Sequence, residues 1–176
     1  MALLGESLVE EWLNREGFFT IRGVRQGVEE MDLLAIRREP SGKIIGWHVE
    51  VQTSFRPIGF ISKLPKGTVN RMSVRKRSAK EIDQCARDWV RSKFRSDGKV
   101  KMRNRLWPDL KWAFHFVHAV VRDKNELKAI ESQGVKLHSF HEILDALSRR
   151  GPDSFSGSAG GDLAEIVSYY RSFGRV

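Results

Sequence analysis

Two apolar runs decide the fold of this chain, Met31-Asp32-Leu33-Leu34-Ala35-Ile36 and Ile44-Ile45-Gly46-Trp47-His48-Val49-Glu50-Val51-Gln52. The segment between them, Glu39-Pro40-Ser41-Gly42-Lys43, has the composition of a turn. Together they predict a β-hairpin that is apolar along both strands. A hairpin folded about this turn sets Asp32 opposite Glu50.

The hairpin gathers polar side chains on one of its faces. Because side chains alternate along a strand, Glu50 and Gln52 project from one face while Val49 and Val51 project from the other. Glu50, Gln52 and Asp32 are therefore expected to converge beside a hydrophobic sheet. Paired carboxylates in such a place commonly bind a hard divalent cation such as Mg²⁺. This pattern predicts a metal site.

A second interpretation of the same acids is that they are solvated on the exposed face of the hairpin. The apolar register of the first strand argues against it, since Asp32 interrupts a run that is otherwise Met, Leu, Leu, Ala and Ile. Such a run is typical of a strand buried on both faces. An Asp is rarely buried without a partner, which favours the metal site.

The order of four segments resembles the PD-(D/E)-x-K nuclease superfamily. They are Gly5-Glu6-Ser7-Leu8-Val9-Glu10-Glu11-Trp12-Leu13, Glu16-Gly17-Phe18, Glu30-Met31-Asp32-Leu33-Leu34-Ala35 and His48-Val49-Glu50-Val51-Gln52. The chain is most similar to archaeal Holliday-junction resolvases and small restriction-endonuclease-like proteins. The matching region spans residues 1 to about 55. The resemblance implies hydrolysis of phosphodiester bonds with Mg²⁺ or Mn²⁺ as the cofactor.

The resemblance also assigns roles to individual residues. Glu6 matches the acid of the first helix, Asp32 the strand Asp, and Glu50 the Glu of the E-x-K pair. Asp32 and Glu50 would bind the metal, with the Val51 carbonyl as a further ligand and Glu6 assisting directly or through water. Gln52 stands where the family usually has Lys, so it would orient the attacking water.

Gln52 replaces the Lys that the family usually has at this position, which is a departure from the family pattern. A Lys can neutralise charge that develops on the phosphate. A Gln can hydrogen-bond a water but carries no charge and is no general base. Since a metal can supply the electrophilic role itself, the exchange leaves activity open. Lys80, on the next expected helix, is a candidate for a cation that has migrated to another element.

Positive charge is concentrated in one part of the chain. The formal net charge is +9, and residues 63–105 hold 15 Lys or Arg against 4 Asp or Glu, a net of +11, which leaves −2 for the rest. A localised basic block next to clustered acids favours phosphate binding over a merely solvated surface. The residues expected to contact nucleic acid are Lys63, Lys66, Arg71, Arg75, Lys76, Arg77 and Lys80.

Hydrophobic periodicity predicts an α/β fold. The expected element order is a restriction-endonuclease-like αβββαβ core, with a mixed central sheet flanked by helices, followed by a further αβα. A nuclease-like domain would span residues 1–150, a Gly/Ser-rich flexible linker 151–161, and a C-terminal helix capped by Asp162 residues 162–176. Residues 95–109 are expected to form a basic loop. The expected core helix covers residues 78–94.

Composition bounds the compartment and the partners. Cys85 is the single cysteine, which excludes an internal disulfide and a Cys-based zinc cluster and fits a reducing cytoplasm. No apolar run reaches the length of a membrane span, and no signal peptide is expected. By analogy with nucleases that act on two strands, a homodimer is expected.

The function predicted from the sequence is a metal-dependent DNA endonuclease. One alternative is a catalytically silent nucleic-acid-binding module on the same fold, with Gln52 marking the loss. Another is a subunit of a larger repair or defence complex that docks through the C-terminal helix. RNA stays open as a substrate, and the sequence has no feature that specifies duplex, junction or single strand.

Overall fold

The computed structural model describes residues 2–54, 59–62, 77–149 and 159–173. It contains a five-stranded mixed sheet with the order β1-β2-β3-β4-β5, in which β1, β2 and β3 are antiparallel and β4 and β5 continue parallel to β3. The elements in chain order are α1 (Ala2–Arg15), β1 (Phe19–Gln26), β2 (Glu29–Arg38), β3 (Ile44–Gln52), α2 (Ala79–Phe94), α3 (Asp97–Leu106), β4 (Trp112–His118), α4 (Lys124–Glu131), β5 (Val135–Ser139), α5 (Phe140–Arg149) and α6 (Ala159–Phe173).

The hairpin expected from the sequence is present as β2 and β3. Its partners run from Leu33 opposite Val49 to Arg38 opposite Ile44, which is the register set by a turn about residue 41. The turn is closed by the Glu39 N–H, which donates to the Lys43 carbonyl over 2.8 Å. The predicted register is confirmed for these pairs.

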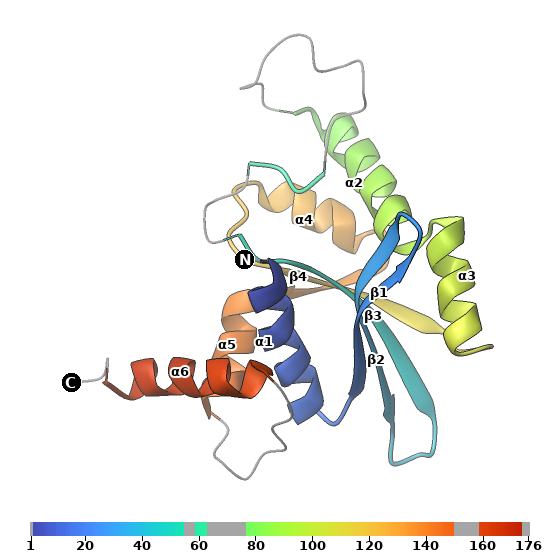
Figure 1. The fold of residues 1–176 in the computed structure, drawn as a ribbon. Helices are drawn as coiled ribbons and strands as arrows, with labels where there is room; N and C mark the ends of the chain where they lie inside the picture. Colours follow the sequence, from blue (N-terminus) through green and yellow to red (C-terminus); the bar gives the residue numbers. More distant parts are fainter. Residues whose placement is uncertain (1, 55–58, 63–76, 150–158, 174–176) are drawn as a thin grey trace.

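Helices cover both faces of the sheet. Figure 1 shows α1, α5 and α6 on one side and α2, α3 and α4 on the other. The contacts of α1 with β1, β2 and β3, and of α3 with β2, agree with this arrangement. The α/β class predicted from the sequence is therefore confirmed, as three layers around a mixed sheet. Within the described part of the chain, no helix has the length and apolar character needed to cross a bilayer.

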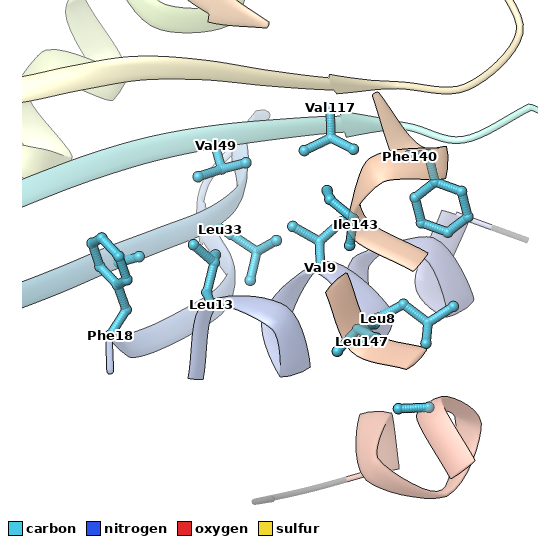
Figure 2. Packing of buried hydrophobic residues seen from close by; sticks show 12 residues of the cluster. Leu8, Val9, Leu13, Phe18, Leu33, Val49, Val117, Phe140, Ile143 and Leu147 are labelled. Atoms are coloured by element: carbon cyan, nitrogen blue, oxygen red, sulfur yellow. The ribbon is translucent and has the colours of Figure 1, made fainter. Parts of the chain in front are cut away.

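The larger hydrophobic core lies between the sheet and α1 with α5. Figure 2 shows Val49 and Val117 projecting from β3 and β4 toward Val9 of α1 and Ile143 of α5. All four side chains are buried. The odd-numbered residues of β3 thus face α1 and α5, which leaves its even-numbered residues for the opposite face.

The predicted loop at residues 95–109 is wrong, because Asp97–Leu106 forms the helix α3. Ser96 is its N-cap, and the Ser96 hydroxyl accepts from the Lys99 N–H. Its buried residues, Lys99, Met102 and Arg103, fall at helical spacing, but two of them are charged. A pattern of apolar residues therefore could not reveal this helix. The last helix also differs, since it begins at Ala159 rather than at Asp162.

The N-terminal end of α1 lies directly on the end of β3. A Cβ added at Gly5 would meet Thr53, whose own Cβ would be only 3.0 Å away. The absence of a side chain at Gly5 thus lets the first turn of α1 approach the sheet. The next residue, Glu6, is held beside the end of β3 as a result.

We expect Gly5→Ala to destabilise the protein by about 1–3 kcal/mol, because the added methyl overlaps the buried, β-branched Thr53. Helix propensity alone predicts the opposite sign, since Ala is the better helix former by about 1 kcal/mol. Urea unfolding monitored by circular dichroism measures the difference. Restoration of stability in the double variant Gly5→Ala, Thr53→Ala, which removes the Thr53 hydroxyl nearest to the added methyl, would confirm the contact with Thr53 as the cause. A stabilised single variant would contradict it.

Candidate metal-binding site

Asp32 lies in β2, next to Leu33, at which the pairing of β2 with β3 begins. The Val51 main-chain N–H donates to its Oδ2 over 2.8 Å, and its Oδ1 accepts no hydrogen bond from any described residue. Burial raises the pKa of Asp32 to about 6, and the charge of Glu50 adds to this effect. The Val51 hydrogen bond and the charge of Lys93 act in the opposite direction. Within the described part of the chain, one carboxylate oxygen of Asp32 therefore has no hydrogen-bond donor and could take a further ligand.

Glu50 is buried and has both oxygens engaged. Lys93 donates to Oε2 over 2.6 Å, while Lys99 donates to Oε1 over 2.9 Å. His48 Nε2 also lies 3.1 Å from Oε1. Burial raises the pKa of Glu50, but the His48 hydrogen bond and the two lysine charges outweigh it and lower the pKa to about 2. Glu50 is thus a carboxylate that its cationic neighbours hold in the ionised form at neutral pH.

The orientation of His48 is fixed from behind by α3. Arg103 has no acceptor, so its Nη1 donates to His48 Nδ1 over 2.8 Å, and it also donates to the Phe94 carbonyl over 2.8 Å. A neutral ring with an accepting Nδ1 carries its proton on Nε2, which then donates to Glu50. Burial lowers the pKa of His48 to about 4, in agreement with a neutral ring.

Glu6 is half-buried near these groups without a direct hydrogen bond to them. Burial raises its pKa, Arg22 lowers it, and the charges of Glu30 and Glu50 raise it again. The structure thus brings Glu6 into the electrostatic field of Asp32 and Glu50. Gln52 lies half-buried at the end of β3, and its side chain makes no hydrogen bond within the described residues.

Sequence reasoning missed four of the residues that surround Glu50. Lys80, the expected migrated cation, is exposed in the first turn of α2, whereas the cations that contact Glu50 are Lys93 and Lys99. Lys93 comes from the last turn of the same helix and was detectable as a basic residue flanking the apolar stripe. The missed residues are Lys93, Lys99, His48 and Arg103.

The donor set fits a hard divalent cation. The Val51 N–H points toward Asp32, and in a strand the carbonyl of the same residue points to the same side. Oxygens of Asp32, Glu50 and the Val51 carbonyl would therefore hold Mg²⁺, which is commonly bound through one or two carboxylates and several waters. Among the residues that the structure covers, there is no group of three or more His, Cys, Asp or Glu side chains that could hold a metal ion.

Most of the residues expected to bind nucleic acid lie outside the described residues. These are Lys63, Lys66, Arg71, Arg75 and Lys76. Arg77 is described, and its side chain, 9% exposed, donates to Ser62 and lies 3.8 Å from the buried carboxylate of Glu126. The guanidinium also lies over the Phe60 ring. Arg77 is thus used within the protein, whereas Lys80 is exposed.

Comparison with known proteins identifies a similar fold. No protein-family model matches the sequence, and no curated protein matches it. The structure is similar to the crystal structure of AF1548, a protein of unknown function, with a TM-score of 0.50 and 14% sequence identity. The alignment covers 96% of this chain and 79% of that chain. At this identity, the similarity extends to the fold alone.

Proposed function

We propose that this protein is a metal-dependent nuclease that hydrolyses phosphodiester bonds in DNA. The observation that supports it best is the convergence of Asp32, Glu50 and the Val51 main chain beside the ammonium of Lys93. A carboxylate pair supplies oxygen ligands for Mg²⁺ or Mn²⁺, and an adjacent ammonium suits a phosphate. A metal-dependent phosphodiesterase needs oxygen ligands for its metal and positive charge near the scissile phosphate.

Each residue has a separate task in this proposal. Asp32 Oδ1, Glu50 Oε2 and the Val51 carbonyl would hold the cation, which when bound would acidify a water and stabilise charge on the scissile phosphate. Gln52 would orient the attacking water through its amide. Lys93 would supply the positive charge that Gln52 lacks. Glu6 would act through a water at the margin of the site.

The arrangement of elements supports membership in the restriction-endonuclease-like group. The order α1-β1-β2-β3-α2, followed after α3 by β4, is the αβββαβ order expected of such proteins. Asp32 in β2 and Glu50 in β3 occupy the strand positions that the resemblance assigns to the two acids. The helix α3 is an addition to that order.

The charge distribution supports nucleic acid as the substrate. The negative charge of the two carboxylates repels a phosphate unless cations compensate it. Residues 63–105 supply a net charge of +11 for this purpose. Exposed Lys80, Arg87 and Arg91 on α2 are available for contacts with the backbone. Binding that depends on several such contacts would weaken steeply with salt.

A silent nucleic-acid-binding module on the same fold is the second candidate function. Gln52 favours it, because an amide can neither accept a proton from water nor offset phosphate charge. In that case the basic residues would act alone, and Glu50 would be retained for stability. Metal dependence separates the two candidates.

The test is cleavage of duplex, single-stranded and four-way-junction DNA, and of RNA, with Mg²⁺ or Mn²⁺. Wild type is compared with Asp32→Ala and with Asp162→Ala, a change of an exposed acid on α6. Metal-dependent cutting that Asp32→Ala abolishes and Asp162→Ala retains would establish the nuclease. Salt-sensitive binding without cutting in all three proteins would favour the silent module.

A further inference from the structure

Two lysines contact the same carboxylate of Glu50, but their surroundings differ. The Lys99 side chain is 4% exposed, and besides Glu50 its ammonium donates to the Lys93 carbonyl over 2.8 Å. The Lys93 side chain is 39% exposed, and its ammonium contacts only Glu50 among the described residues. Lys99 is therefore enclosed by the protein, while Lys93 is partly exposed to solvent.

The two oxygens of Glu50 are also unequal. Each carboxylate oxygen accepts about two hydrogen bonds. Oε1 receives both of its bonds, from Lys99 and His48, and His48 is itself fixed by Arg103. Oε2 receives one bond, from Lys93. A cation approaching Glu50 would thus meet Oε2, at the place where the Lys93 ammonium already lies.

We propose that Lys93 is a built-in substitute for the divalent cation, which holds Oε2 of Glu50 in the metal-free protein and leaves it when the metal binds. The proposal rests on the nuclease function proposed above and adds a regulatory step to the same site. Asp32 contributes to the same field, because its charge also attracts Lys93. On release, the Lys93 ammonium lies at the rim of the site.

Displacement by metal would give Lys93 two successive tasks. Before metal binds, Lys93 offsets the charge of Glu50 and so weakens the repulsion between the carboxylates of Asp32 and Glu50. After metal binds, its ammonium is available to a phosphate oxygen of the substrate. The exchange would couple metal occupancy to the placement of a positive charge, which a lysine buried like Lys99 could not do.

The first measurement is the affinity for Mn²⁺ by isothermal titration calorimetry. If Lys93 competes with the metal, Lys93→Met binds Mn²⁺ about fivefold more tightly than wild type, since loss of a partly exposed ion pair is worth about 1 kcal/mol. Lys93→Gln is expected to show the same gain, and serves if the Met variant does not fold. Lys93→Arg keeps the charge and is expected to show no gain.

Lys128→Met is the matched control for net charge, because Lys128 is exposed on α4 and away from the site. It is expected to leave Mn²⁺ affinity within about twofold of wild type, since a lone surface charge has a small effect. An equal or weaker affinity in folded Lys93→Met and Lys93→Gln would overturn the proposal. So would the absence of Mn²⁺ binding by wild type.

A second measurement detects the release of Lys93 directly. Acetylation of lysines, followed by mass spectrometry, is expected to label Lys93 more strongly when Mn²⁺ is added and to leave Lys128 unchanged. No increase at Lys93 would contradict the exchange. If Mn²⁺ affinity and labelling both follow the proposal while no nucleic acid is cut, the exchange holds and the nuclease function fails, so the two results are distinguishable.

Discussion

Replacement of Glu50 by glutamine is expected to lower the free energy of unfolding by about 3–5 kcal/mol, because one partner of a buried ionic cluster is removed. Glu50 itself is 1% exposed and Lys99 4% exposed. The amide cannot satisfy two ammonium groups, so the buried charge of Lys99 would be left uncompensated. Urea unfolding at pH 7 measures the loss.

The dependence of this loss on pH has a definite sign. The pKa of Glu50 is lowered from 4.5 to about 2, so its stabilising contribution is present above pH 4.5 and is lost as the pH falls toward 2. The difference between wild type and Glu50→Gln should shrink over that range. Glu131→Gln, a change of an exposed acid on α4, is the control and should cost under about 0.5 kcal/mol. A Glu50→Gln protein as stable as this control would contradict the role of the cluster.

Asp32→Asn is expected to raise the stability, opposite to Glu50→Gln, and to lower the cleavage rate of the nuclease proposed above. A neutral side chain loses its attraction for the metal, so the metal-dependent rate should fall by about a hundredfold or more. The amide oxygen of Asn can still accept the hydrogen bond from the Val51 N–H. The local structure of the hairpin should therefore be retained.

The stability gain follows from the raised pKa of Asp32. Its pKa is raised from 3.8 to about 6, so ionisation costs folding free energy as the pH rises through this interval. We expect Asp32→Asn to be more stable than wild type by about 1–3 kcal/mol at pH 7 and equal to it near pH 4. Thermal unfolding at both pH values, without metal, measures the gain. A destabilised Asp32→Asn protein at pH 7 would show that Asp32 is structural, not held at an energetic cost for a ligand.

The hairpin and its acids could be predicted from the sequence because the determining interactions are local. A turn of five residues fixed the register of β2 against β3, and side-chain alternation put Glu50 on the face opposite Val49. The position of Asp32 within an apolar strand revealed its burial. None of these steps needed knowledge of a distant element.

The helix α3 could not be predicted, because its buried face is polar. Lys99 and Arg103 occupy positions that a hydrophobic pattern expects to be apolar, and the side chains that compensate their burial are those of Glu50 and His48. These partners come from β3, far away in the sequence. A buried charge is stable only together with its partner, so the sequence of α3 or of β3 alone does not reveal which charged residues are buried.

The same reason explains why the sequence pointed to Lys80 and did not reveal the contact of Lys93 with Glu50. Both residues lie on α2, at opposite ends. The choice depends on which end of the helix lies over β3, and tertiary packing decides that. Tertiary packing brings Lys93 of α2 and Lys99 of α3 to Glu50, whereas Lys80 is exposed.

The double role of Glu50 has a consequence for how descendants of this protein could diverge. If the protein is the nuclease proposed above, a lineage that lost cleavage would still need Glu50, because Lys99, His48 and Arg103 are buried around it. Among the described residues, Asp32 has no buried cation that depends on it, and its replacement by Asn would raise the free energy of unfolding. Persistence of the glutamate is thus a poor marker of an active relative, and the residue aligned with Asp32 is the informative one.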